Sequence, residues 1–147
     1  MPPTSPTIHA SAVLVGARAV LIQGASGAGK SRLALALLEA AAQGALRFAR
    51  LVADDRAHVE ASHGRLLVRP APALAGLIEV RGLGIRRLPF EPLAVVGTLV
   101  ELGLPSTERL PGPSFTSIAG IRLPRLAVAA GTDPLPLVLA HLKMPVS

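Results

Sequence analysis

One glycine-rich segment constrains this chain more than any other part of it. Residues 24–31, Gly-Ala-Ser-Gly-Ala-Gly-Lys-Ser, match the phosphate-binding pattern G-x-x-x-x-G-K-[ST] in full. Residues 19–22 before it are β-branched or apolar, as in a buried strand, and residues 32–40 after it are rich in strong helix formers. The segment is therefore predicted to join a strand to a helix, which is the setting in which this pattern binds phosphate.

The residue types in this loop indicate what it would bind. Glycines let the backbone bend tightly and turn successive N–H groups toward one point, where the positive end of the helix dipole adds to the attraction. Lys30 would reach the β and γ phosphates of a nucleotide, and the Ser31 hydroxyl would bind Mg²⁺. A turn that merely links a strand to a helix is the alternative, which the matching flanks disfavour. The expected nucleotide-binding residues are Gly24, Ala25, Ser26, Gly27, Ala28, Gly29, Lys30 and Ser31.

Two carboxylates follow the loop in the sequence. Asp54 and Asp55 come directly after a strand predicted at 48–53. In nucleotide sites one such carboxylate holds Mg²⁺, directly or through water, and a second accepts a proton from the attacking group. Because adjacent side chains on a strand point to opposite faces, both can reach one site only if the strand ends there. A solvated turn after the strand is the alternative.

A second cluster is the run Glu-Val-Arg-Gly-Leu-Gly-Ile at 79–85. If this segment is extended, Glu79 and Arg81 project to one face, and the two glycines allow a ligand or partner to approach the backbone closely. A surface ion pair before a loop is the alternative. The four histidines, at 9, 58, 63 and 141, are too far apart in the sequence to suggest a metal site.

Composition bounds the class of protein. A length of 147 residues with 50% apolar residues supports one domain, 1–147, with a flexible N-terminus at 1–7. Three Phe and no Trp or Tyr argue against base stacking on single-stranded nucleic acid, so the net charge of +6 favours an anionic nucleotide and an acidic protein partner. The chain has no cysteine, no secretory-signal pattern and no apolar run of membrane-spanning length. A cytoplasmic protein with no membrane and no nucleic-acid partner is expected.

Periodicity and turn residues predict the remaining elements. Strand pairs are expected at 11–15 with 19–23, at 56–61 with 65–69, and at 114–118 with 121–126. A short element is expected at 77–81, after an irregular connection at 70–76. Helices are expected from 32 to about 42 with an end near Gly44, from 91 to 102 with Pro92 in its first turn, and from 134 to 142 with Asp133 or Thr132 as cap.

In this order, the motifs resemble the catalytic domain of the HPr kinase/phosphorylase family. The matching segments are 8–13, 24–31, 51–55 and 78–85. The likeness covers residues 8–87 well, and residues 118–126 look like a strand pair of the short α-proteobacterial members, which lack the N-terminal domain. The resemblance implies an α/β fold: a single-domain P-loop kinase with a curled mixed sheet and few helices, similar to phosphoenolpyruvate carboxykinase.

The resemblance also implies a reaction, the ATP- and Mg²⁺-dependent phosphorylation of a serine on HPr, the phosphocarrier of the sugar phosphotransferase system. Lys30 and the loop amides would hold the phosphates of ATP, and Ser31 with Glu79 would hold Mg²⁺. Arg81 and the glycine loop after it would organise the site or touch HPr. Members of the family also run a phosphorolysis, in which inorganic phosphate attacks phosphoserine to give pyrophosphate.

The catalytic roles are implied by the same likeness. Asp54 would take the proton from the substrate serine, and Asp55 would assist at the metal or the base. His9 would lie close enough to tune Asp54. Together with Arg81, these residues make up the expected catalytic set.

Two departures from the family pattern bear on these roles. The gap between Lys30 and Asp54 is several residues longer than usual, with 41–45 as the insertion. The C-terminal helix of full-length members, whose arginine is important to dephosphorylation, has no clear counterpart. The sequence therefore favours the kinase reaction over phosphorolysis. Full-length relatives are hexamers, but without their N-terminal domain and tail the formation of a homo-oligomer stays open for this chain.

Two other functions compete with the kinase of HPr. A non-catalytic ATP-sensing regulatory module would bind ATP and a partner, but binding alone needs no proton acceptor, which speaks against it. A kinase for a small-molecule substrate would need a mobile lid that carries arginines. The pair at 86–87 is too short a cluster to establish one.

Overall fold

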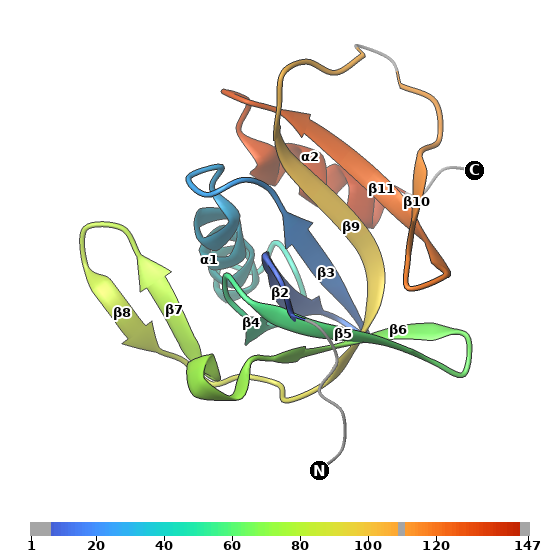
Figure 1. Ribbon diagram of the computed structural model, residues 1–147. Coiled ribbons are helices and arrows are strands. Elements are labelled where there is room, and N and C mark those ends of the chain that lie inside the picture. The colour runs from blue at the N-terminus through green and yellow to red at the C-terminus, as the bar shows by residue number, and fades with distance from the viewer. Residues whose placement is uncertain (1–6, 109–110, 145–147) are drawn as a thin grey trace.

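The computed structural model describes residues 7–108 and 111–144, which form two α-helices and eleven strands (Figure 1). In chain order the elements are β1 (Thr7–Ile8), β2 (Ala10–Val15), β3 (Arg18–Gln23), α1 (Lys30–Ala42), β4 (Ala49–Ala53), β5 (Ala57–Ser62), β6 (Arg65–Pro70), the 3-10 helix η1 (Pro72–Leu74), β7 (Leu77–Val80), β8 (Gly84–Arg87), β9 (Ala94–Leu104), β10 (Phe115–Ile118), β11 (Ile121–Ala129) and α2 (Pro134–Lys143).

One mixed sheet contains nine of these strands. Its main path runs β1-β5-β6-β9-β3-β2-β4, and β11 pairs with β9 and with β10. The long strand β9 is the centre of the sheet, because β3 and β11 both run parallel to it and the start of β9 pairs antiparallel with β6. The remaining pairs of this sheet are antiparallel. The curled mixed sheet with few helices that the family resemblance implied is thus confirmed.

The alternating side chains of β3 show how the two faces of the sheet are covered. Val20 and Ile22 pack in one apolar cluster with residues of α1 and α2, whereas Ala19 and Leu21 pack in a second cluster with β5 and β6. Figure 1 shows the two helices on one face and the β5–β6 hairpin passing over the other. Strand β3, which leads into the 24–31 loop, is therefore buried on both faces and held firmly.

The predicted local elements are largely confirmed. The three strand pairs form hairpins as expected. Helix α1 ends at Ala42, two residues before Gly44, whose φ of 85° is left-handed. Helix α2 begins after Asp133, whose side chain accepts the Leu135 N–H. The expected flexible segment 1–7 lies outside the described residues apart from Thr7, which pairs with His58 in β1. Among the described residues, neither helix has the length and apolarity that a membrane crossing requires.

The helix predicted over 91–102 is wrong, because this segment is the central strand β9. A strand buried on both faces has no polar stripe, so its near-continuous apolar run carries a spacing that a helix can also match. Its pairing partners lie far away in the sequence, in β3 and β11. The β-branched residues Val95, Val96, Thr98 and Val100 are the local signal for a strand.

Strands β7 and β8 form a separate two-stranded hairpin that projects from the body beside α1 (Figure 1). The buried side chain of Ile78 joins the same apolar cluster as α1 and anchors the base of the hairpin. Strand β8 is exposed along its length. The hairpin therefore carries Glu79 and Arg81 on an element that is anchored at one end beside α1.

Candidate active site

The 24–31 loop connects β3 to α1, as the sequence predicts. At Gly29, directly before the helix, φ is 102°, a left-handed conformation that disfavours any side chain. At Gly24 a Cβ atom would lie 3.0 Å from the Ala28 Cβ and 3.2 Å from the Leu102 carbonyl oxygen. The glycines of the pattern thus meet two different demands, a backbone conformation and a close approach to β9.

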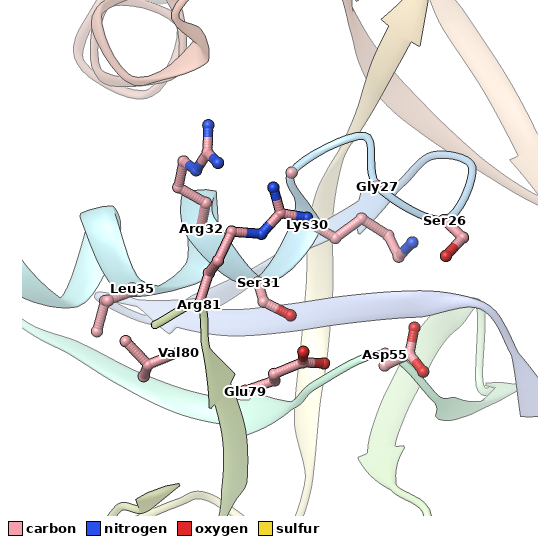
Figure 2. A pocket seen from close by; sticks show the side chains of 11 residues that line it. Ser26, Gly27, Lys30, Ser31, Arg32, Leu35, Asp55, Glu79, Val80 and Arg81 are labelled. Atoms are coloured by element: carbon pink, nitrogen blue, oxygen red, sulfur yellow. The ribbon is translucent and has the colours of Figure 1, made fainter. Parts of the chain in front are cut away.

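A cavity of about 410 Å³ opens beside this loop (Figure 2). Residues from three parts of the chain line it: the loop with the first turns of α1, the second residue after β4, and the end of β7 with the residue that follows it. The lining residues are Ser26, Gly27, Gly29, Lys30, Ser31, Arg32, Leu35, Asp55, Glu79, Val80 and Arg81. The fold therefore brings together three of the sequence motifs that are far apart in the chain.

Charges in the cavity are arranged on opposite sides. In the view of Figure 2, the Glu79 and Asp55 carboxylates lie below the loop, and Lys30, Arg32 and Arg81 lie at or above it. The Lys30 ammonium group is buried against the loop, where it donates to the Gly24 carbonyl at 2.9 Å. Such a cavity can take a polyanion on its cationic side and a cation between the anion and the carboxylates.

Asp54 lies behind the cavity wall and does not line it. Its side chain is only 6% exposed. Oδ1 accepts hydrogen bonds from the Ser11 and Ser31 hydroxyls, both at 2.7 Å, and Oδ2 accepts from the Glu79 N–H at 3.1 Å. Asp54 therefore ties β2, the start of α1 and the hairpin to the end of β4.

Asp55 has the opposite environment. Its side chain is exposed and lines the cavity, and the described residues offer its carboxylate no hydrogen-bond or ion-pair partner. Its φ of 66° is positive, which is uncommon outside glycine. Strand β4 ends at Ala53, directly before the two carboxylates, as is required if both are to reach one site. Asp55 lines the cavity, and Asp54 lies behind the residues that line it.

The donors around Ser31 fit a magnesium ion. The Ser31 hydroxyl gives its proton to Asp54, which leaves its oxygen lone pairs free on the cavity side. Glu79 and Asp55 add carboxylate oxygens in the same cavity. Within 7–108 and 111–144 no group of three or more His, Asp or Glu side chains gathers as in an all-protein metal site. One hydroxyl and two carboxylates are oxygen ligands that suit Mg²⁺, which keeps waters and phosphate oxygens among its ligands.

Not every residue expected at the site reaches the cavity. Gly24, Ala25 and Ala28 shape the loop but do not line the cavity. His9 is exposed just before β2, and in the described structure no bond joins it to Asp54. The side chain from this segment that does contact Asp54 is that of Ser11.

Sequence reasoning missed four residues that take part. Ser11 bonds to Asp54, while Arg32, Leu35 and Val80 line the cavity. Ser11 is buried and polar within an apolar strand, and this contrast is the one signal that could have pointed to it. Arg32 is exposed and Leu35 is partly buried on α1, and periodicity alone does not relate either residue to the β7–β8 hairpin.

Comparison with known proteins gives a consistent result. The family model described as the HPr Serine kinase C-terminal domain matches residues 3–88. HPr kinase/phosphorylase of Streptococcus thermophilus is 45% identical over 80 residues, 54% of this chain and 24% of that protein. HPr kinase/phosphorylase of Clostridium tetani is 39% identical over 82 residues, 56% of this chain and 25% of that protein. The chain thus spans about a quarter of the length of these curated relatives.

A solved structure extends the similarity to nearly the whole chain. The Hpr(Ser) kinase/phosphatase from Coxiella burnetii superposes with a TM-score of 0.76 at 25% sequence identity. The alignment covers 95% of each chain, so it includes β9, β10, β11 and α2, which lie beyond the residues that the family model matches.

Proposed function

The chain belongs to the family of the HPr serine kinase C-terminal domain, and from this premise we propose that it transfers a phosphoryl group from ATP to a serine of HPr. One observation carries the proposal. A single cavity holds the phosphate-loop lysine, Lys30, across from two carboxylates, Asp55 and Glu79. Phosphoryl transfer asks a protein mainly for positioning and charge neutralisation, plus an acceptor for the hydroxyl proton, and this cavity contains groups for each task.

We assign the nucleotide and the metal to the two sides of the cavity. Lys30 and the amides of the 24–31 loop would hold the ATP phosphates, in the manner of a P-loop. Ser31 and Glu79 would hold Mg²⁺, with Asp54 orienting the Ser31 hydroxyl. Mg²⁺, when bound, neutralises charge on the phosphates. Arg81, at the rim, would organise the site or contact HPr.

The geometry favours Asp55 as the group that accepts the serine proton. The family resemblance gave this role to Asp54, whose two oxygens are occupied by three hydrogen bonds behind the wall. A general base must come within hydrogen-bond reach of the proton that it removes. Asp55 meets this condition, because its carboxylate lines the cavity without a protein partner among the described residues.

The setting of the reaction follows from the proposal. HPr and ATP would be the partners, which implies a cytoplasmic site of action. The resemblance to phosphoenolpyruvate carboxykinase, the phosphorolysis reaction and the formation of homo-oligomers all stay predictions. An ATP sensor needs no proton acceptor, so the proposed role of Asp55 favours catalysis over sensing.

The test is incubation of the purified chain with γ-labelled ATP, Mg²⁺ and HPr, alongside Asp55→Asn and the control Glu60→Gln. Glu60 is an exposed carboxylate on β5 that pairs with Arg69 away from the cavity. We expect label on an HPr serine with the unmodified chain and the control. Asp55→Asn should transfer about 100-fold more slowly or less while still binding ATP. No label from the unmodified chain, despite intact ATP binding, would point to a sensor or another substrate.

A further inference from the structure

The backbone at Asp55 forms a tight turn of an unusual kind. The Arg56 N–H donates to the Asp54 carbonyl at 2.8 Å, and φ at the central residue, Asp55, is 66°. A three-residue turn with positive φ at its centre is rare and strained. Strained backbone persists where the surrounding structure holds it in place, and it is concentrated at functional sites.

Strand β2 holds it from two sides. The Ala10 N–H donates to the Asp55 carbonyl oxygen at 3.1 Å. The Ser11 hydroxyl oxygen accepts the Asp55 N–H, also at 3.1 Å. Both polar groups of the Asp55 backbone are thus bonded to consecutive residues of β2, so the direction of the Asp55 side chain is set by this strand.

Ser11 does more than accept this bond. Its hydroxyl proton is donated to Asp54 Oδ1 at 2.7 Å, and the same carboxylate oxygen accepts from Ser31 at 2.7 Å. Ser11 is fully buried, with 0% exposure. One hydroxyl therefore bridges the backbone of Asp55 and the side chain of Asp54, and connects both to the first turn of α1.

The chemistry of this bridge requires a hydroxyl. The group between the Asp55 N–H and the Asp54 carboxylate must accept on one side and donate on the other, which serine and threonine do and alanine does not. Without it the Asp55 N–H would lose its acceptor, and of the two bonds between Asp55 and β2 only the Ala10 bond would remain. The turn could then relax to negative φ and swing the carboxylate out of the cavity.

We propose that Ser11 is a positioning residue that holds the Asp55 turn and so keeps the Asp55 carboxylate directed into the cavity. The proposal rests on the proposed function only for the consequence to catalysis. Its structural part, the dependence of the turn on the Ser11 hydroxyl, stands on the hydrogen bonds of Ser11, Asp54 and Asp55 alone.

Two variants of Ser11 test the proposal, with one matched control. Ser11→Ala removes the hydroxyl, Ser11→Thr keeps it, and Ser117→Ala makes the same change on exposed β10. The first readout is hydrogen exchange of the Asp55 amide by NMR, which needs no activity. We expect exchange at Asp55 to become about tenfold faster in Ser11→Ala and to stay unchanged in the other two.

The second readout is kinetic. In Ser11→Ala we expect kcat to fall about 100-fold with KM for ATP nearly unchanged, because a misplaced base weakens the chemical step and not nucleotide binding. Ser11→Thr should recover most of kcat. A general loss of stability would raise KM for ATP or lower the folded fraction as well, and so would be distinguished.

Several outcomes would overturn the proposal. In the unmodified chain the Asp55 amide must be protected, so exchange as fast as that of an open loop residue such as Gly112 rules it out even if Ser11→Ala fails to fold. Unchanged exchange and kcat in a folded Ser11→Ala also rule it out. If the unmodified chain transfers no phosphate to HPr, the proposed function fails, and the exchange comparison alone decides the role of Ser11.

Discussion

Replacing Asp54 with asparagine separates the tasks of the two adjacent carboxylates. The Asp54 carboxylate accepts three hydrogen bonds, from Ser11 and Ser31 at Oδ1 and from the Glu79 N–H at Oδ2. An asparagine presents an NH₂ donor in place of one oxygen. If the NH₂ group faces the Glu79 N–H, two donors meet. If it faces the serines, the Ser11 and Ser31 protons both lose their acceptor. Either orientation leaves at least one polar group at this site unsatisfied.

The expected loss of stability is set by the cost of leaving at least one such group unsatisfied. Leaving a buried donor without a partner costs about 1–3 kcal/mol, so we expect Asp54→Asn to lower the free energy of unfolding by about 2 kcal/mol. For a chain of this size the melting temperature should fall by about 4–8 °C. Asp55→Asn should change the free energy of unfolding by less than about 0.5 kcal/mol, because this side chain is exposed and Asn tolerates positive φ as well as Asp does.

Urea unfolding followed by far-UV circular dichroism measures both variants, since the chain has no Trp or Tyr for fluorescence. We expect the two variants to rank in opposite orders. Asp54→Asn should be the less stable protein, and Asp55→Asn should be the less active of the two relative to its folded fraction. Equal stability of the two variants would refute the hydrogen-bond argument. A larger loss of stability in Asp55→Asn would refute the placement of the two side chains.

Three further predictions concern other parts of the molecule. Gly29→Ala, at φ 102°, should destabilise the chain by about 1–2 kcal/mol and weaken ATP binding in a titration, whereas Gly112→Ala in open space should do neither. Burial lowers the pKa of His141 below its usual 6.5, so on acidification the unfolded chain binds this proton at a higher pH than the folded chain does. The stability that neutral His141 contributes should therefore be present above pH 6.5 and decrease as the pH falls below it, and His141→Gln should remove this pH dependence of the melting temperature. Arg81→Ala should lower kcat/KM about tenfold by loss of one charged contact, and Arg87→Ala, on exposed β8 outside the cavity, should not.

The elements that the sequence predicts correctly are those fixed by neighbouring residues. The β2–β3 hairpin turns at Gly16, and α2 begins at the Asp133 cap, so each needs only a few consecutive positions. Strand β9 depends instead on β3 and β11, which are remote in the sequence. Strand β8 likewise has no apolar pattern of its own and exists through its pairing with β7. Sequence patterns report local preference, and both of these strands are decided by their partners.

The same limit applies to the site. The pattern at 24–31 points to Lys30 and Ser31 because the glycines of the same segment allow the backbone conformation that the loop needs. The neighbouring residues do not determine which of Asp54 and Asp55 takes which role. Alternation along a strand states only that the two side chains diverge, and which one enters the cavity depends on where β4 ends relative to α1 and β7.

The turn at Asp55 explains how two neighbouring carboxylates take different places at the candidate site. A regular strand would place them on opposite faces, and a regular turn would expose both to solvent. The three-residue turn instead leaves Asp54 in the wall, where it holds Ser31 at the start of α1, and brings Asp55 into the cavity on the other side. Such a turn costs about 1–3 kcal/mol, which is comparable to the net contribution of the bonds that Ser11 and Ala10 make to it. Because the two magnitudes are similar, we expect loss of the Ser11 hydroxyl to release the turn. The position of Asp55 would then be controlled from β2, a strand that touches neither nucleotide nor metal in the proposed arrangement.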